Sequence, residues 1–230
     1  MSSLIDLLKE APPRLIFSPP RNDPELVRAA LAAGAEAIKV HIHARHQASG
    51  TGFGDVLMEG PAIERIRALS DVPVGVVVGD GSAMATRGEL KRLAEIGVDF
   101  IDAYTRHLPA WMLRECPVER MGALAPEDAA EDWASIAGLF DCVEAAVMPH
   151  ERYGTAPVAY DIALYARIRA AVGCPLVIPT QLALEPEDIA TLAHLGFDGI
   201  MIGAIVTGKD AATVEAVCAR FRAACDEVRQ

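Results

Sequence analysis

The sequence predicts a single α/β domain, a (β/α)8 TIM barrel with one additional helix at its N-terminus. Eight short apolar runs of strand length alternate with helical stretches along the 230 residues. Such alternation is typical of a parallel sheet, and eight units in about this length favour a closed barrel over an open sheet. No linker, charge block or low-complexity tract divides residues 1–230, so one domain is expected.

Capping and helix-breaking residues set the expected boundaries. Ser3 can cap a short amphipathic helix that ends at Pro12 and Pro13, a second helix begins near Asp23, and glycines or prolines end most of the others. The expected strands lie at 14–18, 36–45, 74–79, 100–105, 120–124, 143–148, 176–180 and 199–205. The expected helices lie near 3–11, 23–34, 59–70, 85–96, 109–115, 126–139, 160–172, 186–195 and 211–228.

Composition excludes several classes of function. Hydrophobic residues make up 52% of the chain, which fits strands buried on both faces, but no apolar run is long and charge-free enough to span a membrane. The net charge of −11 without a basic tail argues against a nucleic-acid partner. The N-terminus does not have the features of a signal peptide, and five scattered cysteines suit a reducing compartment. A cytoplasmic location is therefore expected.

One predicted strand carries a row of cationic and titratable side chains. In 36–45, apolar residues alternate with Lys39, His41, His43 and Arg45, so these four are expected to share one face. In a closed barrel that face is the interior, which opens at the active-site mouth. Buried unpaired charge is costly, so the row indicates a functional site. An edge strand with its polar face in water is the alternative.

Carboxylates on two other strands are expected to point at the same interior. Asp102 and Tyr104 share a face of the fourth strand, and Glu144 lies on the sixth. Alternate strands of such a barrel share side-chain layers, so Lys39, Asp102 and Glu144 could meet. A lysine beside two carboxylates offers acid/base chemistry or a Schiff base with a carbonyl substrate. A buried ion network that only stabilises the barrel is the alternative.

A metal ion is an optional part of the predicted site. His41 and His43, two residues apart, could hold a divalent ion such as zinc, with Asp102 or Glu144 as a further ligand. A neutral histidine pair that hydrogen-bonds to substrate is the alternative, and no other cofactor is expected. The glycine-rich loop 47–55 is interpreted as a mobile lid or a plain flexible loop, and the loop 149–157, which contains His150, as a second wall.

The last predicted strand and the loop after it, Ile200-Met-Ile-Gly-Ala-Ile-Val-Thr-Gly-Lys-Asp210, resemble the ribulose-phosphate-binding barrel superfamily. That superfamily includes the tryptophan synthase α subunit and N-acetylmannosamine-6-phosphate epimerases. The resemblance implies that backbone N–H groups of Gly203 and Ala204 bind a substrate phosphate. This chain departs from the pattern after strand seven, where Thr180 and Gln181 replace a glycine turn. We expect these two residues to contact the substrate.

Residues 30–67 are similar to the β-keto acid cleavage enzymes, which are zinc-dependent barrels. Their metal is coordinated by a His-x-His pair, which corresponds to His41 and His43 in this sequence. Their acidic ligand comes from late in the barrel, where this chain has Thr180 and Ile205. The resemblance implies zinc-assisted carbon–carbon cleavage.

These observations predict a lyase or isomerase, aldolase- or epimerase-like, that acts next to a carbonyl in a small anionic metabolite, phosphorylated or not. Lys39 would form a Schiff base or stabilise an enolate, Asp102 and Glu144 would move protons, and the histidines would polarise the carbonyl. Arg45 and the last loop would hold the anionic end. The alternative is a catalytically inactive barrel that binds a ligand or serves in assembly. A homo-oligomer formed through apolar helix faces is also expected.

Overall fold

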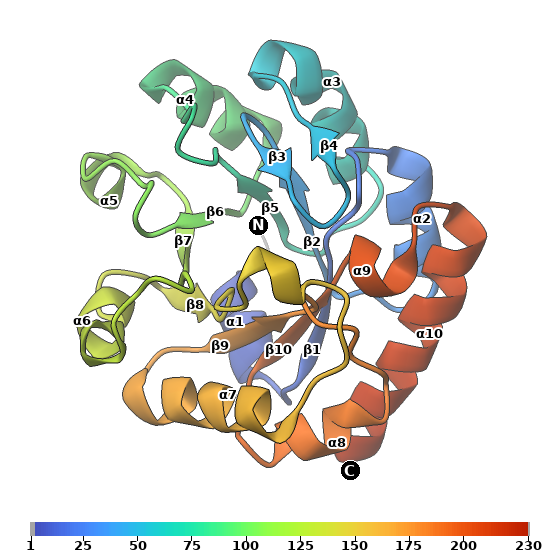
Figure 1. The fold of residues 1–230 in the computed structure, drawn as a ribbon. Helices are drawn as coiled ribbons and strands as arrows, with labels where there is room; N and C mark the ends of the chain where they lie inside the picture. The colour runs from blue at the N-terminus through green and yellow to red at the C-terminus, as the bar shows by residue number, and fades with distance from the viewer. Residues whose placement is uncertain (1–2, 230) are drawn as a thin grey trace.

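The computed structural model, which describes residues 3–229, contains eight parallel strands closed into a barrel (Figure 1). Around the ring these strands are β1 (Arg14–Phe17), β2 (Ala37–His41), β5 (Val74–Val77), β6 (Phe100–Tyr104), β7 (Glu119–Ala123), β8 (Cys142–Glu144), β9 (Leu176–Pro179) and β10 (Gly199–Ile202). Each barrel strand pairs with the barrel strands before and after it in the chain, and β10 closes the ring on β1. The predicted (β/α)8 barrel is confirmed.

Helices surround the barrel in Figure 1, and short strands form a separate hairpin, β3 (Arg45–His46) with β4 (Thr51–Gly52). The α-helices are α1 (Leu4–Lys9), α2 (Pro24–Ala32), α3 (Val56–Arg67), α4 (Arg87–Ile96), α5 (Met112–Glu115), α6 (Trp133–Ala137), α7 (Ala159–Ala171), α8 (Asp188–Ala193), α9 (Ala204–Thr207) and α10 (Ala211–Val228). The 3₁₀ helices are η1 (Ala130–Asp132) and η2 (His150–Arg152).

Local sequence explains where several helices begin. Asp23 caps α2 through the backbone N–H of Glu25, and Thr86 forms a capping box with Glu89 at the start of α4. The helix expected over 126–139 is shorter than predicted: only α6 and the turn of η1 form. The strand expected over 36–45 is also shorter, because the chain leaves the barrel after His41.

The predicted N-terminal helix, α1, closes the bottom of the barrel. Leu4 and Leu8 of α1 are fully buried against side chains from the beginnings of the strands, among them Phe100 and Met121. The backbone N–H of Leu4 donates to the carboxylate of Glu119, the first residue of β7, at 2.8 Å. The helix therefore completes the core at the end of the barrel opposite the strands' carboxyl ends.

Replacing Leu8 with alanine is expected to lower the free energy of unfolding by about 2–5 kcal/mol, because a fully buried side chain leaves a cavity. Urea denaturation measures this loss. Leu57→Ala is the matched control, since Leu57 on α3 is 87% exposed and its truncation should cost less than about 0.5 kcal/mol. Equal losses in the two variants would show that α1 does not contribute to the core.

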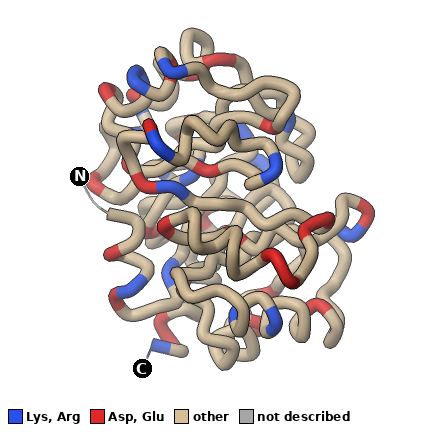
Figure 2. Tube along the Cα trace, turned by 90° about the vertical axis from the view of Figure 1, so that its left-hand side faces the viewer, with Lys and Arg blue, Asp and Glu red and all other residues tan. Residues whose placement is uncertain are grey.

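The surface of the described residues carries both charged groups (Figure 2) and a few exposed apolar side chains. On the side shown in Figure 2, acidic and basic residues are interspersed along the trace. Within residues 3–229, no helix combines the length and apolar character needed to cross a membrane. Large apolar side chains exposed on the described surface include Leu57 and Met58 of α3 and Tyr160 of α7. The expected homo-oligomer stays a prediction, which size-exclusion chromatography tests.

Candidate active site

A cavity of about 150 Å³ opens inside the mouth of the barrel, where the strands reach their carboxyl ends. Alanines at 123 and 146, contributed by β7 and the segment after β8, line part of it. Their small side chains leave space in a layer that bulky aliphatic residues usually fill. Charged and polar side chains, among them Lys39, Asp102 and Glu144, converge on a lining that is otherwise mostly apolar, as is typical of a small-molecule site.

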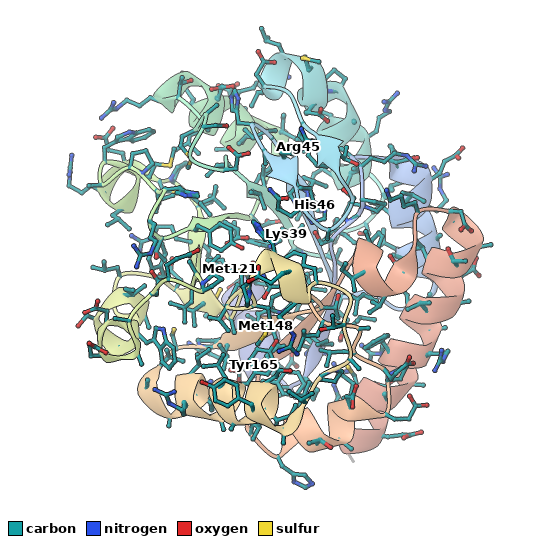
Figure 3. All side chains as sticks on the ribbon, in the orientation of Figure 1. Lys39, Arg45, His46, Met121, Met148 and Tyr165 are labelled. Atoms are coloured by element: carbon teal, nitrogen blue, oxygen red, sulfur yellow. The ribbon has the colours of Figure 1, made fainter. Side chains whose placement is uncertain are left out.

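Three charged side chains from alternate strands meet at the cavity. The Nζ atom of Lys39 on β2 lies 2.6 Å from Oδ2 of Asp102 on β6 and 2.6 Å from Oε2 of Glu144 on β8. All three residues are buried, with exposed fractions of 5%, 2% and 6% respectively. Figure 3 shows Lys39 near the centre of the barrel. The prediction that these three residues meet is confirmed.

The protonation states of Lys39 and Glu144 favour an acid/base role for these three residues. Burial alone would lower the pKa of Lys39, but the Asp102 and Glu144 carboxylates more than offset it and hold the pKa above its ordinary value. Burial, together with the Asp102 charge, raises the pKa of Glu144 to about 8 although Lys39 opposes the shift. Near neutral pH, Lys39 is therefore an ammonium ion and Glu144 carries a proton. A Schiff base needs a neutral amine, so this arrangement favours electrostatic stabilisation by Lys39.

Because the pKa of Glu144 is raised in the folded protein, the free energy of unfolding depends on pH. Between about pH 4.5 and 8, the folded protein binds a proton that the unfolded chain has released, so the free energy of unfolding falls as pH rises. Glu144→Gln cannot titrate and is expected to flatten this slope. Urea denaturation at several pH values within the window measures it. An unchanged slope in the variant would show that Glu144 titrates normally.

His41 lines the cavity as a neutral side chain. Burial, and then the neighbouring His46 and Lys39, hold its pKa well below the ordinary value. Its ring stacks on that of Phe53 with 4.8 Å between the ring centroids, and the centroid of the His46 ring lies 4.5 Å from that of His41. Its Nδ1 atom is buried and has no hydrogen-bond partner among the described residues. Of the predicted histidine pair, His41 thus lies in the site.

His43 lies elsewhere, so the expectation that it shares a face with Lys39 and His41 is wrong. The strand ends at His41, and His43 adopts a positive φ of 50°, which turns the chain. Its Nε2 atom lies 2.7 Å from Oε1 of Glu89, the residue that helps cap α4, and it does not line the cavity. His43 therefore ties the loop after β2 to the start of α4.

The residues present do not fit the zinc site implied by the β-keto acid cleavage resemblance. That site needs two histidines on one metal, whereas His43 is directed to Glu89 and His41 faces the cavity. Across residues 3–229, no three or more His, Cys, Asp or Glu side chains are grouped to hold a metal ion. The expected zinc stays a prediction that elemental analysis tests.

The other predicted binding residues divide into two groups. Those that line the cavity are Arg45, Tyr104, Thr180, Gln181 and Gly203. His150, which is exposed in η2, and Ala204 do not line it. The N–H of Gly203 donates to the hydroxyl of Thr180 at 3.1 Å. The N–H of Gly203 is thus engaged within the protein and Ala204 lies outside the cavity lining, and the phosphate site implied for these two residues stays a prediction.

The loop predicted as a lid forms the β3–β4 hairpin at the cavity mouth. The backbone N–H of Arg45 donates to Asp80 at 2.8 Å, and Nζ of Lys209 donates to the carbonyl of Ser49 at 2.6 Å. Arg45, an exposed residue, contributes to the cavity lining, and its guanidinium group forms no ion pair within residues 3–229. Figure 3 shows Arg45 and His46 on one side of Lys39 and Met148 on the other.

Two cavity residues, His46 and Tyr153, were not among the predicted site residues. His46 hydrogen-bonds through Nδ1 to Ser49 at 2.9 Å, and burial with the nearby Lys39 lowers its pKa to about 4. Tyr153 follows η2 in the loop predicted as a second wall. Neither follows the periodicity of the barrel strands, because His46 lies beyond the end of β2 and Tyr153 beyond the end of β8. The only signal in the sequence was an aromatic side chain in a loop at the barrel mouth.

No family model and no curated protein matches this sequence. Solved structures match its fold. A tryptophan synthase chain from M. tuberculosis has a TM-score of 0.72 at 15% identity, over 97% of this chain and 98% of that one. A tryptophan synthase alpha-subunit from Pyrococcus furiosus gives 0.71 at 17%, over 91% and 98%. Thiamine phosphate pyrophosphorylase from Pyrococcus furiosus gives 0.67 at 14%, over 94% and 96%.

These neighbours are named as tryptophan synthases and a thiamine phosphate pyrophosphorylase, and each aligns with more than 90% of this chain. Their identity to this chain, 14% to 17%, establishes a shared fold and nothing finer. The resemblance drawn from the last strand is confirmed at the level of the fold. Substrate and reaction have to be argued from the site itself.

Proposed function

We propose that this protein is an enzyme, a lyase or isomerase that moves a proton next to a carbonyl group of a small anionic metabolite. The observation that carries the proposal is the buried trio at the cavity, in which Lys39 contacts both Asp102 and Glu144 and Glu144 retains a proton near pH 7. Titratable groups whose environments drive their pKa values apart are typical of acid/base sites.

Each member of the trio has a role that its contacts allow. Asp102 has one buried oxygen, Oδ1, without a donor among the described residues, and it could accept a proton from the carbon next to the carbonyl. The electron pair would move to the carbonyl oxygen, where the ammonium of Lys39 stabilises the resulting enolate. Glu144 would then return a proton, to carbon in an isomerase or to the leaving group in a lyase. Protons and charges balance in both cases.

The anionic end of the substrate fits the mouth of the cavity. Arg45 lies there with a guanidinium group that no described residue pairs, and such a group binds carboxylate or phosphate in two parallel hydrogen bonds. The overall charge of −11 does not oppose this, because local groups dominate the potential inside a cleft. One structural neighbour is by name a thiamine phosphate enzyme, which supports including phosphorylated compounds among the candidates.

Deuterium exchange tests this proposal directly, because it requires only that the α-proton is abstracted and that a deuteron is returned to the same carbon, and it does not require the complete reaction. The protein is incubated in D₂O with pyruvate, 2-oxobutyrate and dihydroxyacetone phosphate, and loss of the α-proton signal is followed by ¹H NMR against protein-free blanks. Accelerated exchange of at least one compound is expected. If the folded protein accelerates none of them, the acid/base proposal fails for small carbonyl compounds, and an inactive ligand-binding barrel becomes the better interpretation.

A further inference from the structure

The orientation of the Gln181 side-chain amide is fixed by a backbone N–H group, which can donate a hydrogen bond but cannot accept one. The backbone N–H of Met148 donates to Oε1 of Gln181 at 3.0 Å. A backbone N–H only donates, so the amide oxygen of Gln181 must face Met148 and its nitrogen must face the other way. Nε2 then donates to the hydroxyl oxygen of Tyr153 at 2.6 Å. Tyr153 therefore accepts a hydrogen bond from Gln181.

The hydroxyl proton of Tyr153 points away from this donor. A hydroxyl oxygen that accepts a hydrogen bond from the Gln181 amide cannot direct its own proton at the same nitrogen. Tyr153 lines the cavity that also contains Lys39 and Glu144, so this proton is available to a ligand.

The loop that carries Tyr153 is held in place on both sides of that residue. The N–H of Gly154 donates to the carbonyl of Gln181 at 2.9 Å, and the N–H of Ala183 donates to the carbonyl of Thr155 at 2.9 Å. Arg152 pairs with the buried carboxylate of Asp161 at 2.8 Å. A donor on a fixed loop loses little conformational freedom when it binds a ligand.

We propose that Tyr153 is a fixed hydrogen-bond donor to a ligand oxygen, and that the cavity selects ligands with an acceptor-only oxygen there, a carboxylate or an enolate. Lys39 supplies a second donor to the same ligand from the barrel floor. This inference rests on the proposed function, because it takes the ligand to be a small carbonyl acid. Gln181 is a positioning residue that acts through Tyr153.

Oxalate is a suitable probe because it is planar, enolate-like and carries only acceptor oxygens. Isothermal titration calorimetry with the full chain is expected to show binding that Tyr153→Phe weakens about 10- to 100-fold, the effect of losing a hydrogen bond to a charged group. Tyr160→Phe is the matched control and should bind as the wild type does, since Tyr160 is 70% exposed and lies outside the cavity lining. Undetectable binding to the wild type, or equal binding by Tyr153→Phe, overturns the inference.

A double-mutant cycle separates positioning by Gln181 from a merely structural role. Gln181→Met keeps the size of the side chain and removes its donor, so Tyr153 can turn its proton away from the ligand. It is expected to weaken oxalate binding in the wild type and to have no further effect in the Tyr153→Phe background. The same weakening in both backgrounds would mean that Gln181 acts on the fold and would overturn its positioning role.

A spectroscopic readout reports on Tyr153 directly. The chain contains four tyrosines, so ¹³Cζ labelling gives few signals, and the one missing in Tyr153→Phe is assigned. Oxalate is expected to shift that signal. If oxalate binds through Tyr153 but no carbonyl compound exchanges, the proposed function fails and this inference stands. If α-proton exchange occurs but Tyr153→Phe binds oxalate as tightly as the wild type does, this inference alone fails.

Discussion

Replacing Glu144 with glutamine is expected to slow α-proton exchange about 100- to 10,000-fold, the usual contribution of a positioned general acid or base. Glutamine keeps the size of the side chain and an oxygen that can accept from Lys39, but it carries no proton to transfer. In the wild type, exchange should also fall above about pH 8, where Glu144 loses its proton. The variant should lack this pH dependence. ¹H NMR in D₂O measures both effects.

Glu151→Gln is the matched control for that change. Glu151 is exposed in η2, in the loop that carries Tyr153, and it does not line the cavity. The Glu151→Gln variant should therefore exchange the α-proton at the wild-type rate. Circular dichroism of both variants checks that the fold is intact. If the folded Glu144→Gln variant exchanges the α-proton at the wild-type rate, another group transfers the proton.

The fold was predictable because its signals are local and repeated. Each strand is a short apolar run, and residues such as Asp23 and Thr86 mark helix starts through their side-chain caps. The barrel closure then follows from the number of units. The helix expected over 126–139 was less predictable, because its length depends on packing that no local residue specifies.

The site was predictable only as far as strand periodicity extends. Lys39, Asp102 and Glu144 lie inside strands, so alternation gave their directions, and their meeting at 2.6 Å is confirmed. His43 lies two residues past the end of β2, where the positive φ breaks the alternation. Tyr153 reaches the cavity from a loop held by tertiary hydrogen bonds to residues near 181. Such long-range contacts leave no periodic signal in the sequence.

Replacing Lys39 with methionine is expected to lower the free energy of unfolding by about 3–5 kcal/mol near neutral pH. The change removes the cation from a buried trio and leaves two carboxyl groups, Asp102 and Glu144, facing each other without compensation. Protonation of Glu144 can relieve that repulsion, and without the cation Glu144 holds its proton more tightly. The loss of stability should therefore be smallest at acid pH and should grow as pH rises. Urea denaturation across this range measures the trend.

Two further variants show whether the trio itself is responsible for that loss. Lys91→Met makes the same substitution at an exposed position on α4 and should change stability by less than about 0.5 kcal/mol. Lys39→Met/Glu144→Gln removes one of the two carboxyl groups and should recover part of the stability that Lys39→Met loses at the alkaline end of the pH range, where Glu144 would otherwise release its proton. Since a packing defect at position 39 would persist in the double variant, recovery distinguishes electrostatic from steric loss. A double variant less stable than Lys39→Met would mean that Lys39 contributes mainly by filling space, and the charge arrangement on which the acid/base proposal depends would then be wrong.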